Sequence, residues 1–163
     1  MNRLAIALTI SAALASTLAH AEAPDLSKVN GSLTAEAGKT YGDIDTVNGS
    51  ISVEEKAVAQ TVETVNGSIT IDPFARVGDV STVNGKILMR NGVAARSVET
   101  VNGSIVGVSN LRIEKGVEAV NGSIEIGASS LVGGNVETVN GAITLLAMKI
   151  GGNVETVNGN VTI

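Results

Sequence analysis

Carboxylates recur in this sequence at a spacing that could bind cations. If the repeated segments that carry them stack, like charges lie ~4.8 Å apart and repel unless they are solvated or neutralised. The column is either a solvated outer face that discourages sideways aggregation, or a weak cation ladder or docking strip for a basic surface. The first interpretation is favoured, because no ligands from other segments converge on it. The column comprises Asp45, Glu63, Glu99, Glu118, Glu137 and Glu155, interrupted by Ser81, and its candidate binding face is Glu63, Glu99, Glu118, Glu137 and Glu155.

Hydroxyls form a second column, one residue later in each segment. Such a column is similar to the flat Thr arrays of ice-binding solenoids, but Ala119 interrupts it and paired Thr-x-Thr rows are absent. Ice binding is therefore not predicted. The members are Thr46, Thr64, Thr82, Thr100, Thr138 and Thr156.

Catalytic chemistry is not predicted. The chain has no Cys, and its one His, His20, lies in a segment that we expect to be removed. Hexapeptide-family acyltransferases, which build coils of similar length, would therefore lack their general base. Long polysaccharide lyases use convergent charged residues, whereas Arg76, Arg90, Arg96 and Arg112 look scattered and solubilising. We expect no enzyme activity, no cofactor and no metal site.

The elements that position these columns follow from one repeat. Val-Asn-Gly occurs eight times, at intervals of 18 or 19 residues, within a fuller unit V-E-T-V-N-G-S-I-x-I. This period is too short for helical-hairpin repeats, and the apolar positions alternate as in strands. The Asn-Gly pairs form a structural corner ladder of Asn30, Gly31, Asn48, Gly49, Asn66, Gly67, Asn84, Gly85, Asn102, Gly103, Asn121, Gly122, Asn140, Gly141, Asn158 and Gly159.

The predicted fold is all-β, a single-stranded parallel β-solenoid of about eight rungs with three short faces per rung. Each rung would bury the apolar residue before the motif, the motif Val and the Ile that follows, for example Val62, Val65 and Ile69. A looser fourth column includes Ile71 and is broken by Gly107. Neighbouring rungs ~4.8 Å apart would make a rod of roughly 38 Å.

The corners should contain left-handed backbone, which Gly and Asn tolerate best. Stacked Asn side chains could also bond to one another along the rod. A second corner is marked by pairs such as Gly42-Asp43 and Gly78-Asp79. The extra residues of the two longer intervals are expected near Ser109-Asn110 and within 128–133, bulging outward.

Two other interpretations of Asn-Gly are weaker. Antiparallel hairpins would require partners for sixteen very short strands. The Asn-Gly-Ser triplets match the N-glycosylation sequon, but in a bacterial export product Ser follows by repetition.

The N-terminus carries an export signal. Arg3 precedes an apolar run over 4–18, and Ala19-His20-Ala21 is a cleavage site, so we assign 1–21 as a cleaved signal peptide and 22–163 as the solenoid domain. The apolar run is too short for a membrane span, and no later segment is apolar enough to provide one. The protein is expected in the bacterial periplasm, secreted or at the cell surface. A net charge of −5 without a basic stripe argues against nucleic acid as a partner.

With V-E-T-V-N-G-S-I in view, nearly the whole mature chain resembles exported bacterial adhesin-type β-solenoids, a family of domains of unknown function. More distantly, its rung length and Gly-Asp/Asn corners are similar to those of bactofilins. That resemblance implies a three-faced solenoid that polymerises end to end, although the export signal departs from a cytoskeletal role.

The ends of such a rod suggest a function. The polar stretch 22–28 is a candidate N-terminal cap, while the sequence stops in mid-rung at 160–163. It is therefore either a fragment that lacks its cap or a chain with an edge for self-association. We expect a non-catalytic structural or adhesin-like envelope protein that self-assembles end to end. The alternative is a binding module whose face recognises a glycan, a cation or an envelope protein.

Overall fold

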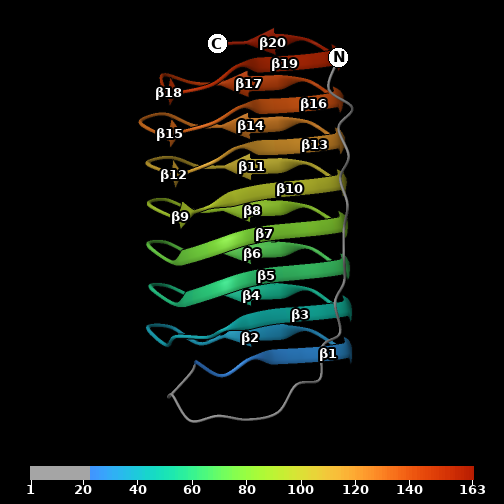
Figure 1. Ribbon diagram of the computed structural model, residues 1–163, viewed down its shortest axis with the longest axis vertical. Coiled ribbons are helices and arrows are strands. Elements are labelled where there is room, and N and C mark those ends of the chain that lie inside the picture. Colours follow the sequence, from blue (N-terminus) through green and yellow to red (C-terminus); the bar gives the residue numbers. More distant parts are fainter. Residues whose placement is uncertain (1–22) are drawn as a thin grey trace.

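The computed structural model describes residues 23–163, and these form a parallel β-solenoid of about eight turns (Figure 1). The described residues contain no helix, and hence none long and apolar enough to cross a membrane. The assigned signal peptide and Glu22 lie outside this range. The predicted all-β solenoid is confirmed.

Three stacks of strands make the faces of the rod. The motif face carries Val-Asn-Gly, and all its neighbouring strands pair in parallel. Its strands are β1 (Leu26–Asn30), β3 (Asp43–Asn48), β5 (Val58–Asn66), β7 (Arg76–Asn84), β10 (Ser97–Asn102), β13 (Val117–Asn121), β16 (Val136–Asn140) and β19 (Val154–Asn158).

The Ile face follows each Asn-Gly corner and forms a separate sheet of eight strands. They are β2 (Leu33–Ala35), β4 (Ile51–Val53), β6 (Ile69–Ile71), β8 (Ile87–Met89), β11 (Ile105–Gly107), β14 (Ile124–Ile126), β17 (Ile143–Leu145) and β20 (Val161–Thr162).

The short face closes each turn and leads back to the motif face. Both β5 and β7 run from it into the motif face without a break, so the two faces belong to one sheet. Beyond β7 the short face has separate strands, namely β9 (Ala94–Ala95), β12 (Arg112–Ile113), β15 (Leu131–Val132) and β18 (Lys149–Ile150).

The pairing register shows where the longer rungs carry their extra residue. Ala94 pairs with Arg112, which is 18 residues further along the chain, but Val98 pairs with Val117, which is 19 residues further. The insertion therefore lies within 114–116, in the corner between the short face and the motif face. The prediction near Ser109-Asn110 was wrong. In the next rung the longer corner is 133–135, which the predicted range touches only at its last residue.

The first described rung also differs from expectation. Residues 26–30 form β1, which pairs in register with β3. Residues 26–28 of the polar stretch predicted as a cap thus belong to the first strand of the stack.

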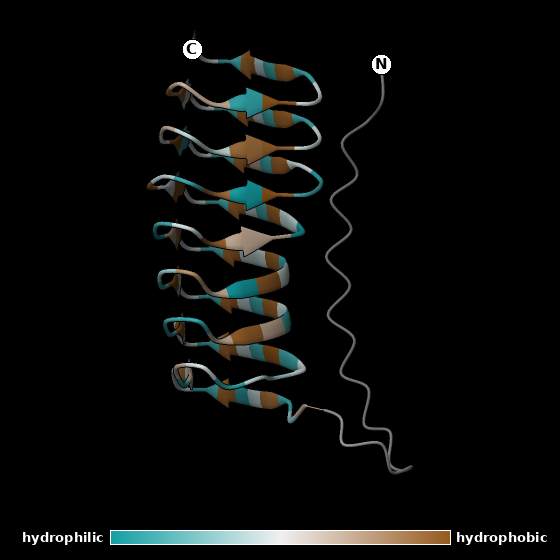
Figure 2. Ribbon diagram, turned by 90° about the vertical axis from the view of Figure 1, so that its left-hand side faces the viewer, coloured by the Kyte–Doolittle hydropathy of each residue, from teal (hydrophilic) through white to brown (hydrophobic). Residues whose placement is uncertain are grey.

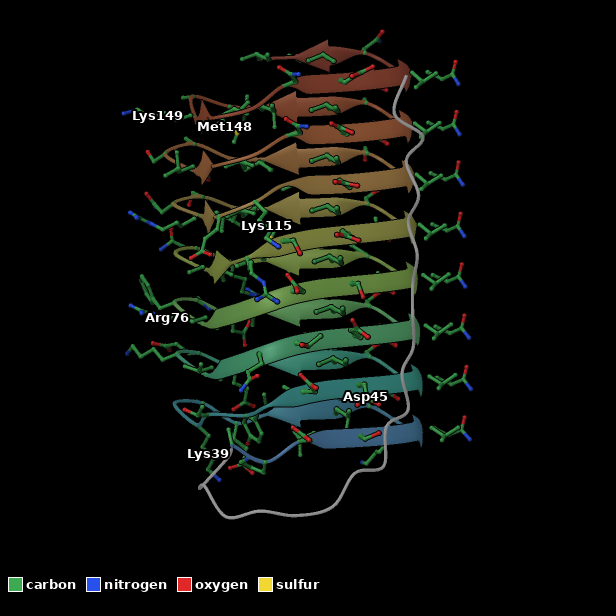
Figure 3. All side chains as sticks on the ribbon, in the orientation of Figure 1. Lys39, Asp45, Arg76, Lys115, Met148 and Lys149 are labelled. Carbon is green, nitrogen blue, oxygen red and sulfur yellow. The ribbon has the colours of Figure 1, made fainter. Side chains whose placement is uncertain are left out.

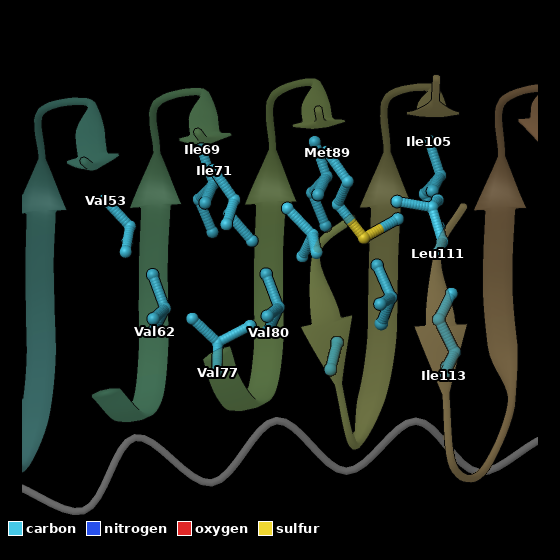
Figure 4. Packing of buried hydrophobic residues seen from close by; sticks show 14 of the residues in the cluster. Val53, Val62, Ile69, Ile71, Val77, Val80, Met89, Ile105, Leu111 and Ile113 are labelled. Atoms are coloured by element: carbon cyan, nitrogen blue, oxygen red, sulfur yellow. The ribbon is translucent and has the colours of Figure 1, made fainter. Parts of the chain in front are cut away.

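The core runs along the rod axis as columns of identical or similar side chains (Figure 4). Two of the inward columns are mostly uniform, with Val62 stacked on Val80 and Ile69 on Ile87, whereas a third column is mixed and stacks Ile71 on Met89. At Gly107 the expected column is empty, and a Cβ there would stand 2.3 Å from Leu111 Cδ1. Leu111, itself 2% exposed, therefore fills the gap.

One core assignment was wrong. The motif Val column points outward and is exposed or half-exposed, whereas the Thr column between the two Val columns is buried in every rung except the last, where Thr156 is half-buried. Figure 2 shows the alternation of hydrophobic and hydrophilic residues along the strands. Strict alternation from the inward Val98 places Thr100 inside and Val101 outside. A buried Thr column cannot serve as an exposed ice-binding array.

The buried Thr hydroxyls bond to the neighbouring Asn-Gly corner. Thr64 Oγ1 donates to Gly49 O at 2.9 Å and Thr82 Oγ1 donates to Gly67 O at 3.0 Å. A polar side chain is tolerated inside because its hydroxyl has this partner. Ala119 replaces the donor in one rung.

The conformation predicted for the Asn-Gly corners was also wrong. Among the motif glycines only Gly31 has a positive φ. What requires glycine there is space, because a Cβ on Gly67 would stand 1.9 Å from Gly49 O. Left-handed backbone occurs instead between the Ile face and the short face, in a column of Gly38, Lys56, Phe74, Gly92, Asn110, Ser129 and Ala147.

Candidate functional site

An amide ladder runs along the Asn-Gly corner. Each Asn donates through Nδ2 to Oδ1 of the Asn one rung earlier, from Asn48 to Asn30 at 2.9 Å through to Asn158 and Asn140 at 2.9 Å. The intervening bonds measure 2.8–3.0 Å. Every bond points the same way, so the ladder has a polarity, with a spare donor at Asn30 and a spare acceptor at Asn158.

The acidic residues form a strip in register on the motif face. Glu99 pairs with Glu118, and Glu118 pairs with Glu137. Lower on the rod, Asp45 and Glu63 are in register with Ser81, and these three line a hollow of about 30 Å³. The structure thus stacks Glu99, Glu118, Glu137 and Glu155 in register, whereas Ser81 separates Glu63 from Glu99. Among residues 23–163, however, no three acidic, His or Cys side chains gather closely enough to hold a metal ion.

The strip is electrostatically unfavourable where its side chains are half-buried. Burial raises the pKa of Glu118, and the charges of Glu99 and Glu137 raise it further. Burial likewise raises the pKa of Glu63, reinforced by nearby acidic groups that include Asp43 and Asp45. The protonated form of both side chains is therefore favoured relative to an isolated glutamate.

A groove of about 730 Å³ lies away from the acidic strip, across the short face and the left-handed corner that precedes it. It spans three consecutive rungs, and its floor is the middle rung, where Gly92 and Ala94 offer little or no side chain. The rungs on either side present larger residues in the same two columns. The walls thus carry Phe74 and Arg76 on one side and Arg112 on the other.

Three arginines line this groove. Arg96 is held by Asp79, with Nε at 2.8 Å from Oδ1, and this hydrogen bond lowers the pKa of Asp79. Neither Arg76 nor Arg112 makes a salt bridge to any described residue, and both are exposed. Figure 3 shows Arg76 projecting from the side of the rod that carries the short face, away from Asp45.

The arginines that looked scattered in the sequence are thus partly gathered. Arg76, Arg96 and Arg112 line one groove, whereas Arg90 does not line it and pairs with Asp72 at 3.0 Å. A signal for this groove is present in the sequence, because Arg76, Ala94 and Arg112 are separated from one another by one repeat period and so occupy equivalent positions in three successive rungs.

No protein-family model, curated protein or solved structure matches this chain. The assignment of function therefore depends on the chemistry of its own surfaces.

Proposed function

We propose that this chain is a non-catalytic structural rod of the bacterial cell envelope, adhesin-like in kind, that assembles end to end. One observation carries the proposal: the first and last described rungs present matching edges. Within the rod, Gly141 N donates to Asn158 O at 3.0 Å and Ile143 N donates to Asn160 O at 2.8 Å. Gly159 N and Val161 N occupy the equivalent positions in the last rung and would donate to Asn30 O and Ser32 O of a second copy.

The side chains at the two edges are complementary as well. The spare Nδ2 of Asn30 would donate to the spare Oδ1 of Asn158 in the neighbouring copy, which extends the ladder with its polarity unchanged. Val29, Val157, Val161 and Ile163 are exposed at these ends, and stacking would cover apolar surface. Pairing of the strand edges and burial of Val161, which continues the inward column of Ile143, both favour association.

The N-terminal targeting pattern supports placement in the envelope, and the repeat's similarity to adhesin-type solenoids supports the structural role. The alternative, a binding module, is favoured by the groove on the short face.

Assembly is testable with one substitution and a matched control. Val161→Lys places a charge in the inward column that a second copy would cover, whereas Thr162→Lys adds the same charge to the outward column. For residues 22–163 we expect rods that lengthen with protein concentration in negative-stain images and sedimentation velocity. Val161→Lys should stay monomeric, and Thr162→Lys should assemble like the parent.

A ladder-specific variant tests the polarity. Asn30→Asp keeps the acceptor for Asn48 Nδ2 but removes the donor that faces the next copy, so it should weaken assembly and leave the fold intact. A parent protein that is monomeric at every concentration would contradict the proposal.

A further inference from the structure

The groove on the short face is built by a gap in a column of large side chains. The outward column of this face reads Thr40, Val58, Arg76, Ala94, Arg112, Leu131 and Lys149. Ala94 is its smallest member and the one that stands between two arginines. Because the rungs are ~4.8 Å apart, Arg76 and Arg112 start about 9.6 Å apart on either side of it. That width accommodates a single ring between the two guanidinium groups.

The groove is cationic on an acidic chain. Arg76 and Arg112 have no salt-bridge partner among the described residues, and Arg96 is neutralised by Asp79. Glu114 is the one acidic residue in the lining. Guanidinium groups bind carboxylates with two parallel hydrogen bonds, so the free pair is suited to a planar anion.

Phe74 provides an apolar surface in the same groove. It is the only Phe of the chain and is 52% exposed. Its φ is 61°, a conformation that side-chain-bearing residues rarely adopt. The ring leans over Gly92, where an added Cβ would stand 2.6 Å from its Cδ1. Left-handed backbone is shared by the other members of this corner column, so Phe74 is distinguished by its exposed aromatic ring beside two unpaired arginines. An apolar surface next to a few convergent polar groups is typical of ligand sites.

We propose that this groove binds a short acidic oligosaccharide, one sugar ring lying against Phe74 with its carboxylate held by Arg76 and Arg112. The volume of about 730 Å³ lies within the ~300–1,000 Å³ typical of small-ligand sites. A neutral glycan would leave both arginines unpaired. Nucleic acid is a poorer fit, because single-strand sites present successive aromatic rings and the adjoining motif face is acidic.

The site can be tested on residues 22–163 by isothermal titration with trigalacturonate, with maltotriose as a neutral probe and inorganic phosphate as an anion without a sugar ring. We expect saturable binding of trigalacturonate alone. Arg76→Gln and Arg112→Gln should each weaken it about tenfold, as expected for loss of a charge-assisted hydrogen bond. Phe74→Ala should weaken it similarly and should fold, since Ala147 occupies the same left-handed column.

The decisive variant retains every charge. Ala94→Leu fills the floor, and Leu131 shows that this column accepts Leu, so the variant should fold and lose binding. Arg90→Gln removes one positive charge outside the groove and should bind like the parent. Binding that survives Ala94→Leu, equal binding of maltotriose, or no heat with trigalacturonate at millimolar concentration would each overturn the proposal. Assembly of the rod is measured separately, so the two proposals fail independently.

Discussion

Glycine at the Asn-Gly corner of this solenoid serves close stacking. The motif glycines after Gly31 have no positive φ. A Cβ added to any of them would nevertheless stand 2.2 Å or less from the carbonyl oxygen of the motif glycine one rung earlier. Gly38 is the opposite case, with φ at 68° and nothing within 4 Å of the absent Cβ. The same residue type is thus required for two different physical reasons.

These reasons predict different costs for the same substitution. Gly38→Ala should destabilise by about 1 kcal/mol, the cost of left-handed backbone with a Cβ. Gly67→Ala must displace the backbone of the neighbouring rung, and we expect a loss of at least about 3 kcal/mol, in the range of severe packing defects. Urea unfolding of both variants measures the difference. Equal losses would show that conformation, and not space, determines the requirement at Gly67.

At the scale of the strands, much of the fold could be predicted from the sequence. The period of the repeat sets the pairing partner of each strand, and the apolar columns set the number of rungs. The motif Val column was wrongly predicted to lie in the core because its residues are apolar. The alternation of side chains along each strand, which directs them outward, has the stronger effect. Only the strand geometry shows that Thr100, two positions after Val98, must share its inward side.

The groove could not be predicted in the same way. Its arginines stand in the variable half, where no motif marks the register and the outward positions differ from rung to rung. The groove also depends on the small side-chain volume at Gly92 and Ala94. Small residues form a groove only when the equivalent positions of the two adjacent rungs carry large side chains, so the register must be known first.

The acidic strip predicts an unusual dependence of stability on pH. The raised pKa of Glu118 means that the folded chain binds more protons than the unfolded chain between the ordinary value of 4.5 and the raised one. Stability should therefore fall as pH rises through this window, because deprotonation is costlier in the folded state. Glu118→Gln should raise Tm at pH 7, and the gain should shrink towards pH 4.

Glu125→Gln is the matched control for this experiment. Glu125 lies on the Ile face in β14, where its partners in register are Val106 and Thr144, so it has no acidic neighbour in its column. Its substitution should change Tm little at either pH. A gain for Glu118→Gln that is independent of pH, or equal to that of Glu125→Gln, would contradict a role for repulsion along the strip.

On the scale of the whole molecule, the glutamate strip and the unpaired arginines lie on different faces. The strip that contains Glu99, Glu118 and Glu137 follows the motif face, while Arg76 and Arg112 lie on the short face, within the three rungs of the groove. End-to-end assembly would extend the strip and the amide ladder and would repeat the groove once per copy. A polymer of this kind would present its ligand sites at a regular spacing, which favours multivalent attachment to an extended glycan.

A rod whose rungs contact only their neighbours should tolerate removal of one whole rung. Deleting 49–66 joins Asn48 to Gly67 and so recreates an Asn-Gly corner. Because Val62 is removed, Ile44 would then stack directly on Val80 in the same inward column. We expect a folded β-protein with a lower Tm and a urea m-value smaller by about one eighth, since stability is approximately a sum over rungs and their interfaces. Deleting only β5, residues 58–66, removes half a turn, so β4 no longer leads into a motif-face strand, and β3 and β7 lose the strand that pairs with both. This deletion should abolish cooperative unfolding. If both deletions unfold alike, the rungs depend on contacts beyond their neighbours, and the rod is a single cooperative unit whose length cannot be adjusted by whole repeats.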